Sequence, residues 1–323
     1  MHPEKLIAHI ETTAPLFLAE PWDKCGVQIA SQATDIRILC VALDPTLETI
    51  QQAIDLGADF LLCHHPVTLS PKLPNKVDDF HRMLSLALGR GLWVYSAHTT
   101  VDANPQGPVH WLARRLGLLE TRVLEVTQVQ TQTYVRLLKH VDTRIIENFT
   151  QYSHSTGESI GEFLLWPKEL DSFQRQLPAG SYIQQPVPFN DHQFGFGCIG
   201  TLPTTLPWSE FAGQLAQILP VSWRMIGTVP EHIRSVAYCP GSGADFAPRA
   251  FALGADIFLT GDLKYHQAQA LEGKGFTLDV GHFYLEEAMM QTWSDDLARE
   301  LAPDVQVLFI SGRDPFTMYC QQG

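Results

Sequence analysis

Long hydrophobic runs are missing from this sequence, and so is any export signal at its start. No apolar stretch approaches the roughly 20 residues that a membrane-spanning helix needs. The first residues, MHPEKLIAHIETTAP, carry neither the basic start nor the apolar segment of a signal peptide. We therefore predict a cytoplasmic protein that does not engage a membrane.

Closely spaced cysteines are also missing. The chain has no CxxC pair, and its six cysteines are Cys25, Cys40, Cys63, Cys198, Cys239 and Cys320. Structural zinc sites and disulfide scaffolds use tighter spacing. We expect most of these cysteines to be buried as small hydrophobic side chains.

Positive charge is scarce. The chain has 22 Lys and Arg against 35 Asp and Glu, a formal net charge of −13. Non-specific binding to nucleic acid depends on basic side chains that neutralise phosphates, so this composition argues against it. A small anionic ligand stays open, because a bound metal ion inverts the local field. The 323 residues, 45% of them hydrophobic, suit two domains or one domain with an insertion.

What the sequence does have is an alternation of strand-like and helical segments. After a predicted helix over residues 4–19, the first half predicts strands over residues 36–43, 58–66 and 92–102 and helices over 45–57 and 78–91. The C-terminal part repeats the order, with strands over 235–240, 255–262 and 276–282 and helices over 244–254 and 264–275. This order is typical of an α/β fold with a mostly parallel sheet covered by helices.

The two parts also resemble each other in sequence. Residues 53–63, AIDLGADFLLC, align with residues 250–260, AFALGADIFLT, and residues 91–102 align with 275–286. The second alignment places His98 and Asp102 opposite His282 and Glu286. General similarity between β-α-β units explains the first match but not the paired histidine and carboxylate. We infer a duplicated α/β module whose halves face one another.

Between the two copies the character of the chain changes. We predict a first α/β lobe over residues 1–126, a middle insertion over 127–230 and a second α/β lobe over 231–323 that packs with the first. The glycines and prolines of residues 193–207 favour a loop-rich lobe. Residues 208–219 predict a helix that leads back into the second half.

The first chemical motif is His64-His65-Pro66, at the end of an apolar strand. Adjacent strand residues point to opposite faces, so both rings serve one site only if the strand is already turning. Pro66 favours such a turn because it ends the hydrogen-bond ladder. Ligands bind at the carboxyl ends of parallel strands, where this pair stands. The alternative is a pair of ordinary loop histidines.

Two further pairs favour metal binding. His282 and Glu286 stand four residues apart at the start of a predicted helix, so their side chains share one face. His98 and Asp102 have the same spacing. An imidazole and a carboxylate placed in this way reach one divalent ion or bridge two, and Zn, Mn, Fe, Co and Ni accept these ligands. Three such clusters at three predicted strand ends argue against chance surface contacts.

Two more segments carry weaker signals. Asp262 and His266, in TGDLKYHQA, match the position of the histidine pair in the other half. Four roles fit these two residues: metal ligands, partners that orient the ligands, an acid/base pair, or a purely structural role. For His266 we favour catalysis or orientation of a ligand. The glycines of CPGSGAD suit either an anion-binding turn before a helix or a simple tight turn.

Together these motifs resemble one known family, the NIF-three-like proteins, whose members are also described as type 2 relatives of GTP cyclohydrolase I. The resemblance covers almost the whole chain outside the middle segment and is carried by PWDKCGVQI, GADFLLCHHP, SAHTTVDANPQG, GFGCIGTL, GADIFLTGDLKYHQA and DVGHFYLEE. It implies two related α/β lobes that flank a cleft with a dinuclear metal site, a short inserted middle lobe, and assembly into a homohexamer. It implies as metal ligands His64, His65, Asp102, His282 and Glu286, with His98 close by.

The functional hypothesis is a hydrolase that depends on two divalent metal ions per chain. Two such ions lower the pKa of a bridging water and stabilise an oxyanion, and His98 or His266 acts as general acid or base. Ring opening of GTP is one such reaction, and hydrolysis of another small nucleotide-like substrate is a second. Two other classes stay open: a protein that binds or delivers metal ions without turnover, and an interaction scaffold that uses the middle lobe.

Overall fold

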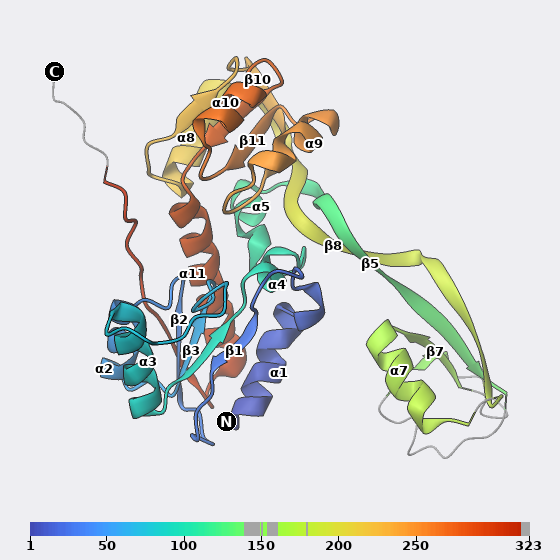
Figure 1. Cartoon of the computed structure of the whole chain (residues 1–323). Helices are drawn as coiled ribbons and strands as arrows, with labels where there is room; N and C mark the ends of the chain where they lie inside the picture. The colour runs from blue at the N-terminus through green and yellow to red at the C-terminus, as the bar shows by residue number, and fades with distance from the viewer. Residues whose placement is uncertain (139–148, 150, 154–160, 179, 318–323) are drawn as a thin grey trace. The chain divides into compact units, whose positions relative to one another are not determined.

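The computed structural model describes residues 1–138, 149, 151–153, 161–178 and 180–317. The chain divides into two compact units, one formed by Met1–Glu125 with Gly195–Gly323 and the other by Val126–Phe194 (Figure 1). No helix in the described part of the chain is long and apolar enough to span a membrane.

The first sheet of the larger unit has five strands in the order β1-β4-β3-β2-β13. They are β1 (Gly26–Ile29), β2 (Ile38–Ala42), β3 (Phe60–Cys63), β4 (Trp93–Ser96) and β13 (Gln306–Phe309). Strands β2, β3 and β4 are parallel, β13 is parallel to β2, and β1 is antiparallel to β4. The parallel core of the sheet agrees with the predicted α/β class.

Helices cover both faces of this sheet. The helices of this part of the chain are α1 (Pro3–Thr13), α2 (Leu47–Asp55), α3 (Asp79–Arg90), α4 (Thr99–Asp102) and α5 (Trp111–Leu116), with short 3₁₀ turns η1 (Leu16–Leu18) and η2 (Pro108–His110). Figure 1 shows α2 and α3 together on one face and α1 on the other. Alternate residues of β3 face the two cores: Phe60 packs in the core of α1, and Leu61 in that of α2 and α3. A strand buried on both faces explains the continuous apolar run.

Local sequence sets the ends of these helices. The Thr46 side chain accepts a hydrogen bond from the Thr49 amide at the start of α2, and Gly91 ends α3 in the left-handed conformation. The prediction of one helix over residues 4–19 is wrong in its second half, because α1 ends at Thr13. Pro15 cannot continue a helix and excludes helical backbone from the residue before it.

The second sheet contains the same module. Its strands β9 (Arg224–Ile226), β10 (His232–Tyr238), β11 (Ile257–Thr260) and β12 (Phe276–Asp279) lie in the order β10-β11-β12-β9. Strands β10, β11 and β12 are parallel and β9 is antiparallel to β12, which matches β2, β3, β4 and β1. The accompanying helices are α8 (Trp208–Ile218), α9 (Ala247–Ala252) and α10 (Tyr265–Leu271), with the turn η3 (Ala244–Phe246).

One detail repeats in both copies. The Asp59 carboxylate accepts hydrogen bonds from the amides of Arg37 and Ile38, at 2.8 and 3.1 Å. The Asp256 carboxylate accepts them from the amides of Arg234 and Ser235, both at 2.8 Å. In each copy the aspartate of the GAD motif therefore ties the start of one strand to its neighbour.

Helix α11 (His282–Leu301) joins the two lobes of this unit. Its buried face includes Leu285, Met289 and Trp293. These residues share one hydrophobic core with Leu39 of the first sheet and Val236 of the second. The beginning of α11 is thereby fixed at the carboxyl edge of both sets of parallel strands.

Two long strands depart from the prediction. Strands β5 (Leu119–Leu137) and β8 (Tyr182–Pro207) contribute residues to both units. Residues 193–207, predicted as loop-rich, belong to β8, which is antiparallel to β10. The glycines allow close packing: a Cβ at Gly197 would lie 2.8 Å from the Tyr238 carbonyl oxygen, and one at Gly200 would lie 3.0 Å from the Leu119 carbonyl oxygen.

The smaller unit contains parts of β5 and β8 with β6 (Gln151–Ser153), β7 (Glu162–Leu165) and α7 (Pro167–Gln176). Its core holds Phe163 and Phe173, whose ring centroids are 5.2 Å apart. This unit is shorter than the predicted insertion over 127–230. Residues 195–230, which include α8 and β9, pack with the larger unit instead.

The cysteines of the described chain agree with the expectation of buried hydrophobic side chains. Cys40, Cys63, Cys198 and Cys239 are buried, and Cys25 is partly buried. Cys320 lies outside the described residues.

Candidate metal centre

His64 and His65 leave the end of β3 at the carboxyl edge of the first sheet. Their amides continue the ladder, donating to the carbonyl oxygens of Ala42 at 3.2 Å and Leu43 at 3.0 Å. The two ring centroids nevertheless lie only 4.9 Å apart. Because side chains of a straight strand point to opposite faces, the chain has turned here, and both rings reach one site.

The remaining side chains of this site come from two helices, α4 and α11. His98 is the residue before α4, and Asp102 is the last residue of that helix. His282 is the first residue of α11, and Glu286 lies one turn further on. The spacing of four brings His282 Nε2 within 2.7 Å of Glu286 Oε2.

Glu286 stands at the middle of the group. Its Oε2 lies 3.1 Å from His65 Nε2, and its Oε1 lies 3.6 Å from His64 Nε2. Asp102 Oδ2 lies 3.7 Å from His64 Nε2 on the other side. The structure thus brings together all the residues that the sequence predicts as ligands, from both lobes. His64 is fully buried, and Glu286 is 3% exposed.

Two buried donor atoms of this group lack a hydrogen-bond partner, and the others face one another. Among the described residues, the buried atoms without a partner include His64 Nε2 and Asp102 Oδ1, whereas His282 Nε2 and His65 Nε2 lie 2.7 and 3.1 Å from the same oxygen, Glu286 Oε2. A buried polar atom without a partner costs about 1–3 kcal/mol, and imidazole nitrogens and carboxylate oxygens that converge from both lobes call for a ligand between them. Imidazole nitrogens and carboxylate oxygens are the donors that first-row divalent ions prefer, so the residues fit a metal ion.

Two overlapping groups have the geometry to hold an ion. His64, His65 and His98 form one, and His65, His282 and Glu286 form the other, with the ligand atoms of each group within 4.8 Å of one another. His65 belongs to both groups and lies between them. The geometry admits His98 as a further ligand, beside the catalytic role that the sequence predicts.

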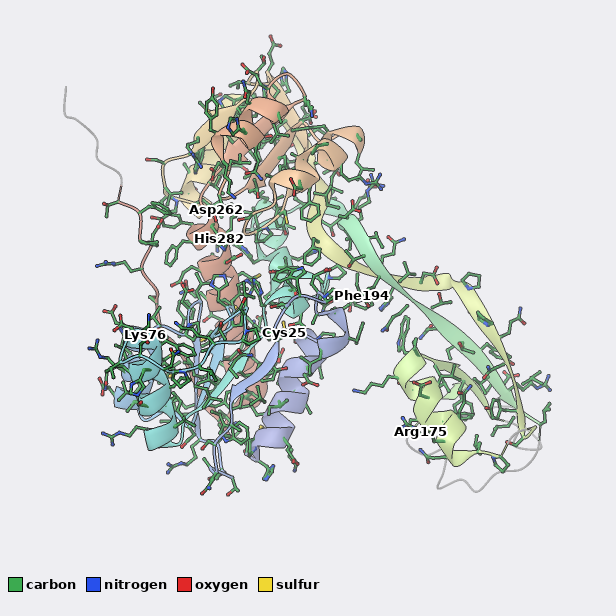
Figure 2. The ribbon with its side chains drawn as sticks, in the orientation of Figure 1. Cys25, Lys76, Arg175, Phe194, Asp262 and His282 are labelled. Atoms are coloured by element: carbon green, nitrogen blue, oxygen red, sulfur yellow. The ribbon has the colours of Figure 1, made fainter. Side chains whose placement is uncertain are left out.

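A carboxylate holds the other nitrogen of three of these rings. Nδ1 of His65 lies 2.7 Å from Asp44 Oδ1, and Nδ1 of His282 lies 2.8 Å from Asp262 Oδ2. Nδ1 of His98 lies 2.9 Å from Asp23 Oδ1. Figure 2 shows Asp262 and His282 side by side. Such carboxylates fix the ring and direct the Nε2 lone pair at a metal.

Sequence reasoning missed Asp44 and did not assign Asp23. Asp44 follows the end of β2 by two residues, at the same edge of the sheet as His65. A polar residue at the end of a neighbouring parallel strand is a signal that could have found it. Asp23 precedes β1 and lies 75 residues from His98 in the chain, so no local spacing connects the two.

The model of the Duf34/NIF3 (NGG1p interacting factor 3) family matches residues 1–315. The chain belongs to this family. A GTP cyclohydrolase 1 type 2 homolog from Halalkalibacterium halodurans is 28% identical to it, with 97% of this chain and 98% of that protein covered. Another such homolog, from Staphylococcus aureus, is 24% identical, with 96% and 98% covered.

Two solved structures have the same fold. A Bacillus cereus protein related to NIF3 superposes with a TM-score of 0.80 at 26% identity, and 99% of each chain is covered. A Staphylococcus aureus protein superposes with a TM-score of 0.77 at 21% identity, also with 99% of each chain covered. The predicted family and its fold are confirmed.

Electrostatics in this Duf34/NIF3 centre follow from burial and close carboxylates. Burial lowers the pKa of His65, but hydrogen bonds with Asp44 and Glu286 outweigh it and raise the pKa to about 10. For His282 burial is outweighed by Glu286 and Asp262, and its pKa rises to about 9. Burial and the nearby Glu286 raise the pKa of Asp102. Both rings are therefore protonated at neutral pH without a metal, and a binding ion has to displace these protons.

The glycine turn after β10 packs directly against the centre. A Cβ at Gly241 would lie 2.6 Å from Glu286 Oε1, and one at Gly261 would lie 2.4 Å from the His282 amide nitrogen. The Gly243 amide donates to Thr260 Oγ1 at 2.8 Å. Because that amide is already used inside the protein, the geometry favours the tight turn over an anion-binding loop.

His266, the second predicted catalytic residue, lies in the first turn of α10 and is exposed. Its ring meets that of Tyr265 edge to face, with centroids 5.2 Å apart. It belongs to neither of the two ion-binding groups of the described chain. Its catalytic role stays a prediction.

Proposed function

We propose that the chain is a hydrolase that uses two divalent metal ions at this centre and acts on a small substrate. The observation that carries the proposal is the set of buried imidazole nitrogens and carboxylate oxygens that both lobes contribute and that gather around Glu286. A cavity of about 900 Å³ reaches His65 and His282 and offers room for such a substrate. Zn, Mn, Fe, Co and Ni all suit these donors.

Bound divalent ions supply Lewis acidity and lower the pKa of a coordinated water. The chain's own groups prepare the centre for that chemistry. Asp44 and Asp262 hold the Nδ1 atoms of His65 and His282, so both Nε2 atoms face the Glu286 carboxylate, and their lone pairs become available to an ion once the Nε2 protons leave. Glu286, whose oxygens lie near rings of both groups, and Asp102, beside His64, would supply the carboxylate oxygens that hold the ions.

We assign the proton transfer to His98. Its Nδ1 is held by the buried Asp23 carboxylate, which leaves Nε2 as the atom that accepts or donates a proton. The ring lies 5.1 Å from that of His64 and 5.5 Å from that of His65, beside the predicted ligands. A histidine held in one tautomer by a carboxylate is a common general base. His266 is the second candidate for this role.

For the substrate, the names of the relatives point to ring opening of a purine nucleotide such as GTP. That reaction is a hydrolysis at a carbon between two ring nitrogens and fits a centre that activates water. Hydrolysis of another small nucleotide-like substrate is consistent with the same geometry.

The decisive experiment compares turnover with metal content. Protein loaded with each candidate ion is assayed on GTP and on a panel of phosphoester and amide substrates, beside His65→Ala and Glu286→Gln variants. We expect both variants to lose activity by about 10³-fold or more, with lower metal content. The exposed His232 provides a matched control as His232→Ala. Equal turnover in all four proteins, or far fewer than two ions per wild-type chain, contradicts the proposal.

The role of His98 is tested separately with His98→Gln. If His98 transfers protons, the variant keeps its metal content and loses most of its activity, together with the corresponding limb of the pH profile. Loss of metal in step with activity would instead make His98 a ligand, as the first ion-binding group allows.

A second function, metal binding and delivery without turnover, has one observation in its favour. Asp44 and Asp262, which orient two of the rings, are 44% and 46% exposed, so solvent reaches the partners of the centre. Exchange of bound ion with a chelating dye within seconds, combined with no turnover on the panel, would support delivery. An interaction scaffold is the third alternative, and partner binding that ignores the metal content would support it.

The quaternary structure is also a proposal. The family resemblance implies a homohexamer of this chain, and light scattering coupled to size-exclusion chromatography measures it directly. A monomer at micromolar concentration contradicts this assignment without affecting the metal centre.

A further inference from the structure

Trp22 is exposed, unlike every other tryptophan of the chain. All seven tryptophans lie among the described residues. Trp22 is 54% exposed, whereas the other six are buried or partly buried. Folded proteins bury most of the surface of this large, mainly apolar side chain. The exposure of the Trp22 ring is therefore a feature that packing of the fold does not explain.

This ring lies beside the candidate metal centre. It meets the His98 ring edge to face, with centroids 5.8 Å apart. The His98 ring in turn lies 5.1 Å from that of His64 and 5.5 Å from that of His65. The His98 side chain is 16% exposed, so solvent reaches it. Because Trp22 does not line the cavity beside His65 and His282, it marks a second approach to the centre, on the side of His98.

Hydrogen bonds on both sides of Trp22 hold this turn in place. The Asp23 amide donates to the Glu20 carbonyl oxygen at 2.9 Å, and the Glu20 amide donates to Thr99 Oγ1 at 3.1 Å. The buried Asp23 carboxylate accepts from the Thr99 amide at 3.0 Å and faces His98 Nδ1 at 2.9 Å. The turn is thus fastened to the chain around His98. A ligand that meets the indole has little backbone to order, which favours binding.

An indole that is fixed next to a metal centre and open to solvent suits contact with a flat ring. Two aromatic rings in offset or edge-to-face contact gain more than burial of their area alone. Nucleic-acid bases stack on aromatic side chains of proteins in this way. Contact with His98 would require only a smaller apolar side chain, and it leaves more than half of the indole in solvent.

From these observations we propose that Trp22 is a binding subsite of the centre and takes a planar aromatic or heteroaromatic ring of the substrate. The proposal rests on the proposed metal-dependent function and names the class of substrate: a molecule in which such a ring adjoins the bond that is hydrolysed. Trp22 contacts and places this ring, and the proton transfer remains with His98. The subsite selects a flat ring, whatever the charge of the rest of the molecule.

Hydroxamic acids test this proposal, because the hydroxamate group binds divalent metal ions whatever the rest of the molecule is. The probes are acetohydroxamic acid and three pairs that carry a phenyl or a cyclohexyl ring, joined to the hydroxamate directly or through one or two methylene groups. Their dissociation constants are measured by calorimetry on the Zn²⁺-loaded full-length protein. Burial alone gives no preference for the phenyl ring. We expect at least one phenyl probe to bind about 3–10-fold more tightly than its cyclohexyl partner.

Two variants tie this preference to Trp22. Trp22→Leu keeps an apolar side chain and should abolish the preference, with zinc content and affinity for acetohydroxamic acid unchanged. Trp22→Phe keeps a smaller aromatic ring and should retain part of the preference. The matched control is Trp166→Leu. Trp166 also lies against a histidine ring, that of His192 at 4.3 Å, but it belongs to the smaller unit, so this variant should leave every ratio unchanged.

The outcomes separate this proposal from the proposed function. If acetohydroxamic acid does not bind in a zinc-dependent way, the metal centre itself is contradicted, and the subsite fails with it. If it binds but no phenyl probe exceeds its cyclohexyl partner, or if Trp22→Leu leaves the preference intact, the subsite alone is overturned. Unchanged ratios together with an altered oligomeric state of Trp22→Leu, measured by light scattering, would assign the exposed ring to contact with a second copy and would also overturn the subsite.

Discussion

At the scale of residues, the centre depends on pairs in which a carboxylate orients a ring. The atoms that would hold the proposed ions belong to His65, His282 and Glu286, but Asp44 and Asp262 decide which way the two rings face. Removing a ligand therefore changes how many ions bind, whereas removing its partner changes how tightly they bind.

This difference predicts the effect of Asp44→Asn and Asp262→Asn. Each substitution keeps the size of the side chain but removes its negative charge, so the ring is held less firmly. We expect metal affinity to fall by about 10–100-fold, measured by competition with a chelator. Because both aspartates are nearly half exposed, the thermal stability of the metal-free protein should change little. Unchanged affinity in both variants would contradict the orienting role.

Gly241 offers a second prediction, with a control of the same backbone conformation. Gly241 has φ of +67°, and a Cβ there would lie 2.6 Å from Glu286 Oε1, whereas Gly254 has φ of +88° with open space around it. Alanine at either position strains the backbone, at about 1 kcal/mol. Only Gly241→Ala should also lower metal affinity, because Glu286 has to move. Chelator competition and thermal unfolding of the two variants make the comparison, and equal metal affinity would contradict it.

At the scale of elements, the repeat of three parallel strands with an antiparallel edge strand explains where the centre lies. Carboxyl ends of parallel strands collect ligands at one edge. Here β3 supplies His64 and His65, while the segments after β4 and β12 supply the two helix starts. Two such edges that face each other place donor side chains on both sides of the proposed pair of metal ions.

The shared GAD motif predicts matched effects on stability. Asp59→Ala and Asp256→Ala each leave two backbone amides at a strand start without their acceptor. We expect each variant to lose about 1–3 kcal/mol of unfolding free energy in urea titrations. The exposed Asp304, as Asp304→Ala, should lose less than about 0.5 kcal/mol. A large loss in one copy and none in the other would show that the two motifs differ in role.

At the scale of the whole molecule, every residue of the centre and its cavity belongs to the larger unit. The smaller unit, Val126–Phe194, has a core of its own around Phe163. Metal binding and the smaller unit are therefore separable in principle.

Replacing Val126–Phe194 with a short Gly-Ser linker tests that separation. Leu124 and Gly197 are already in close contact, so a short linker closes the gap. We expect the shortened chain to bind the same number of ions with the same affinity, measured by elemental analysis and chelator competition. Folded chain that has lost its metal would show that the smaller unit is needed at the centre.

A pH dependence follows from His110, which is not one of the predicted ligands. Burial lowers its pKa from 6.5 to about 4, with a smaller contribution from Arg114. Since the unfolded chain takes up this proton first, the stabilisation is present above pH 6.5 and is lost as the pH falls toward 4, by up to about 1.4 kcal/mol per pH unit. With a chelator present, His110→Gln should lose less stability between these pH values than wild type. The exposed His232, as His232→Gln, should behave like wild type.

Much of the fold was predictable because it depends on neighbours along the chain. Apolar runs predicted β2, β3 and β11, and the amphipathic pattern predicted α2 and α3. The 26-residue strand β8 was not predictable in this way, because its glycines and prolines are turn formers in isolation. Only contact with β10 and β5 makes Gly197 and Gly200 necessary where they stand.

The predicted metal ligands were accessible to sequence reasoning for the same reason. Two histidines in succession and two histidine-carboxylate pairs at a spacing of four are local patterns. The duplication of the module showed that the two pairs occupy matching positions. The orienting carboxylates were less accessible, because Asp44 lies 21 residues and Asp23 lies 75 residues from the ring that it holds. The cavity wall contributed by Asp314 and Phe316 has no sequence pattern at all.

The sequence by itself determined the α/β module, its duplication and the residue types at the strand ends, since periodicity and spacing act within a turn or a strand. Only the tertiary structure decided that both lobes meet at Glu286, that aspartates distant in sequence orient the rings, and that a cavity opens beside them. These features depend on which strand ends α11 brings together. Hydrophobic packing along Leu285, Met289 and Trp293 makes that choice, and no local pattern encodes it.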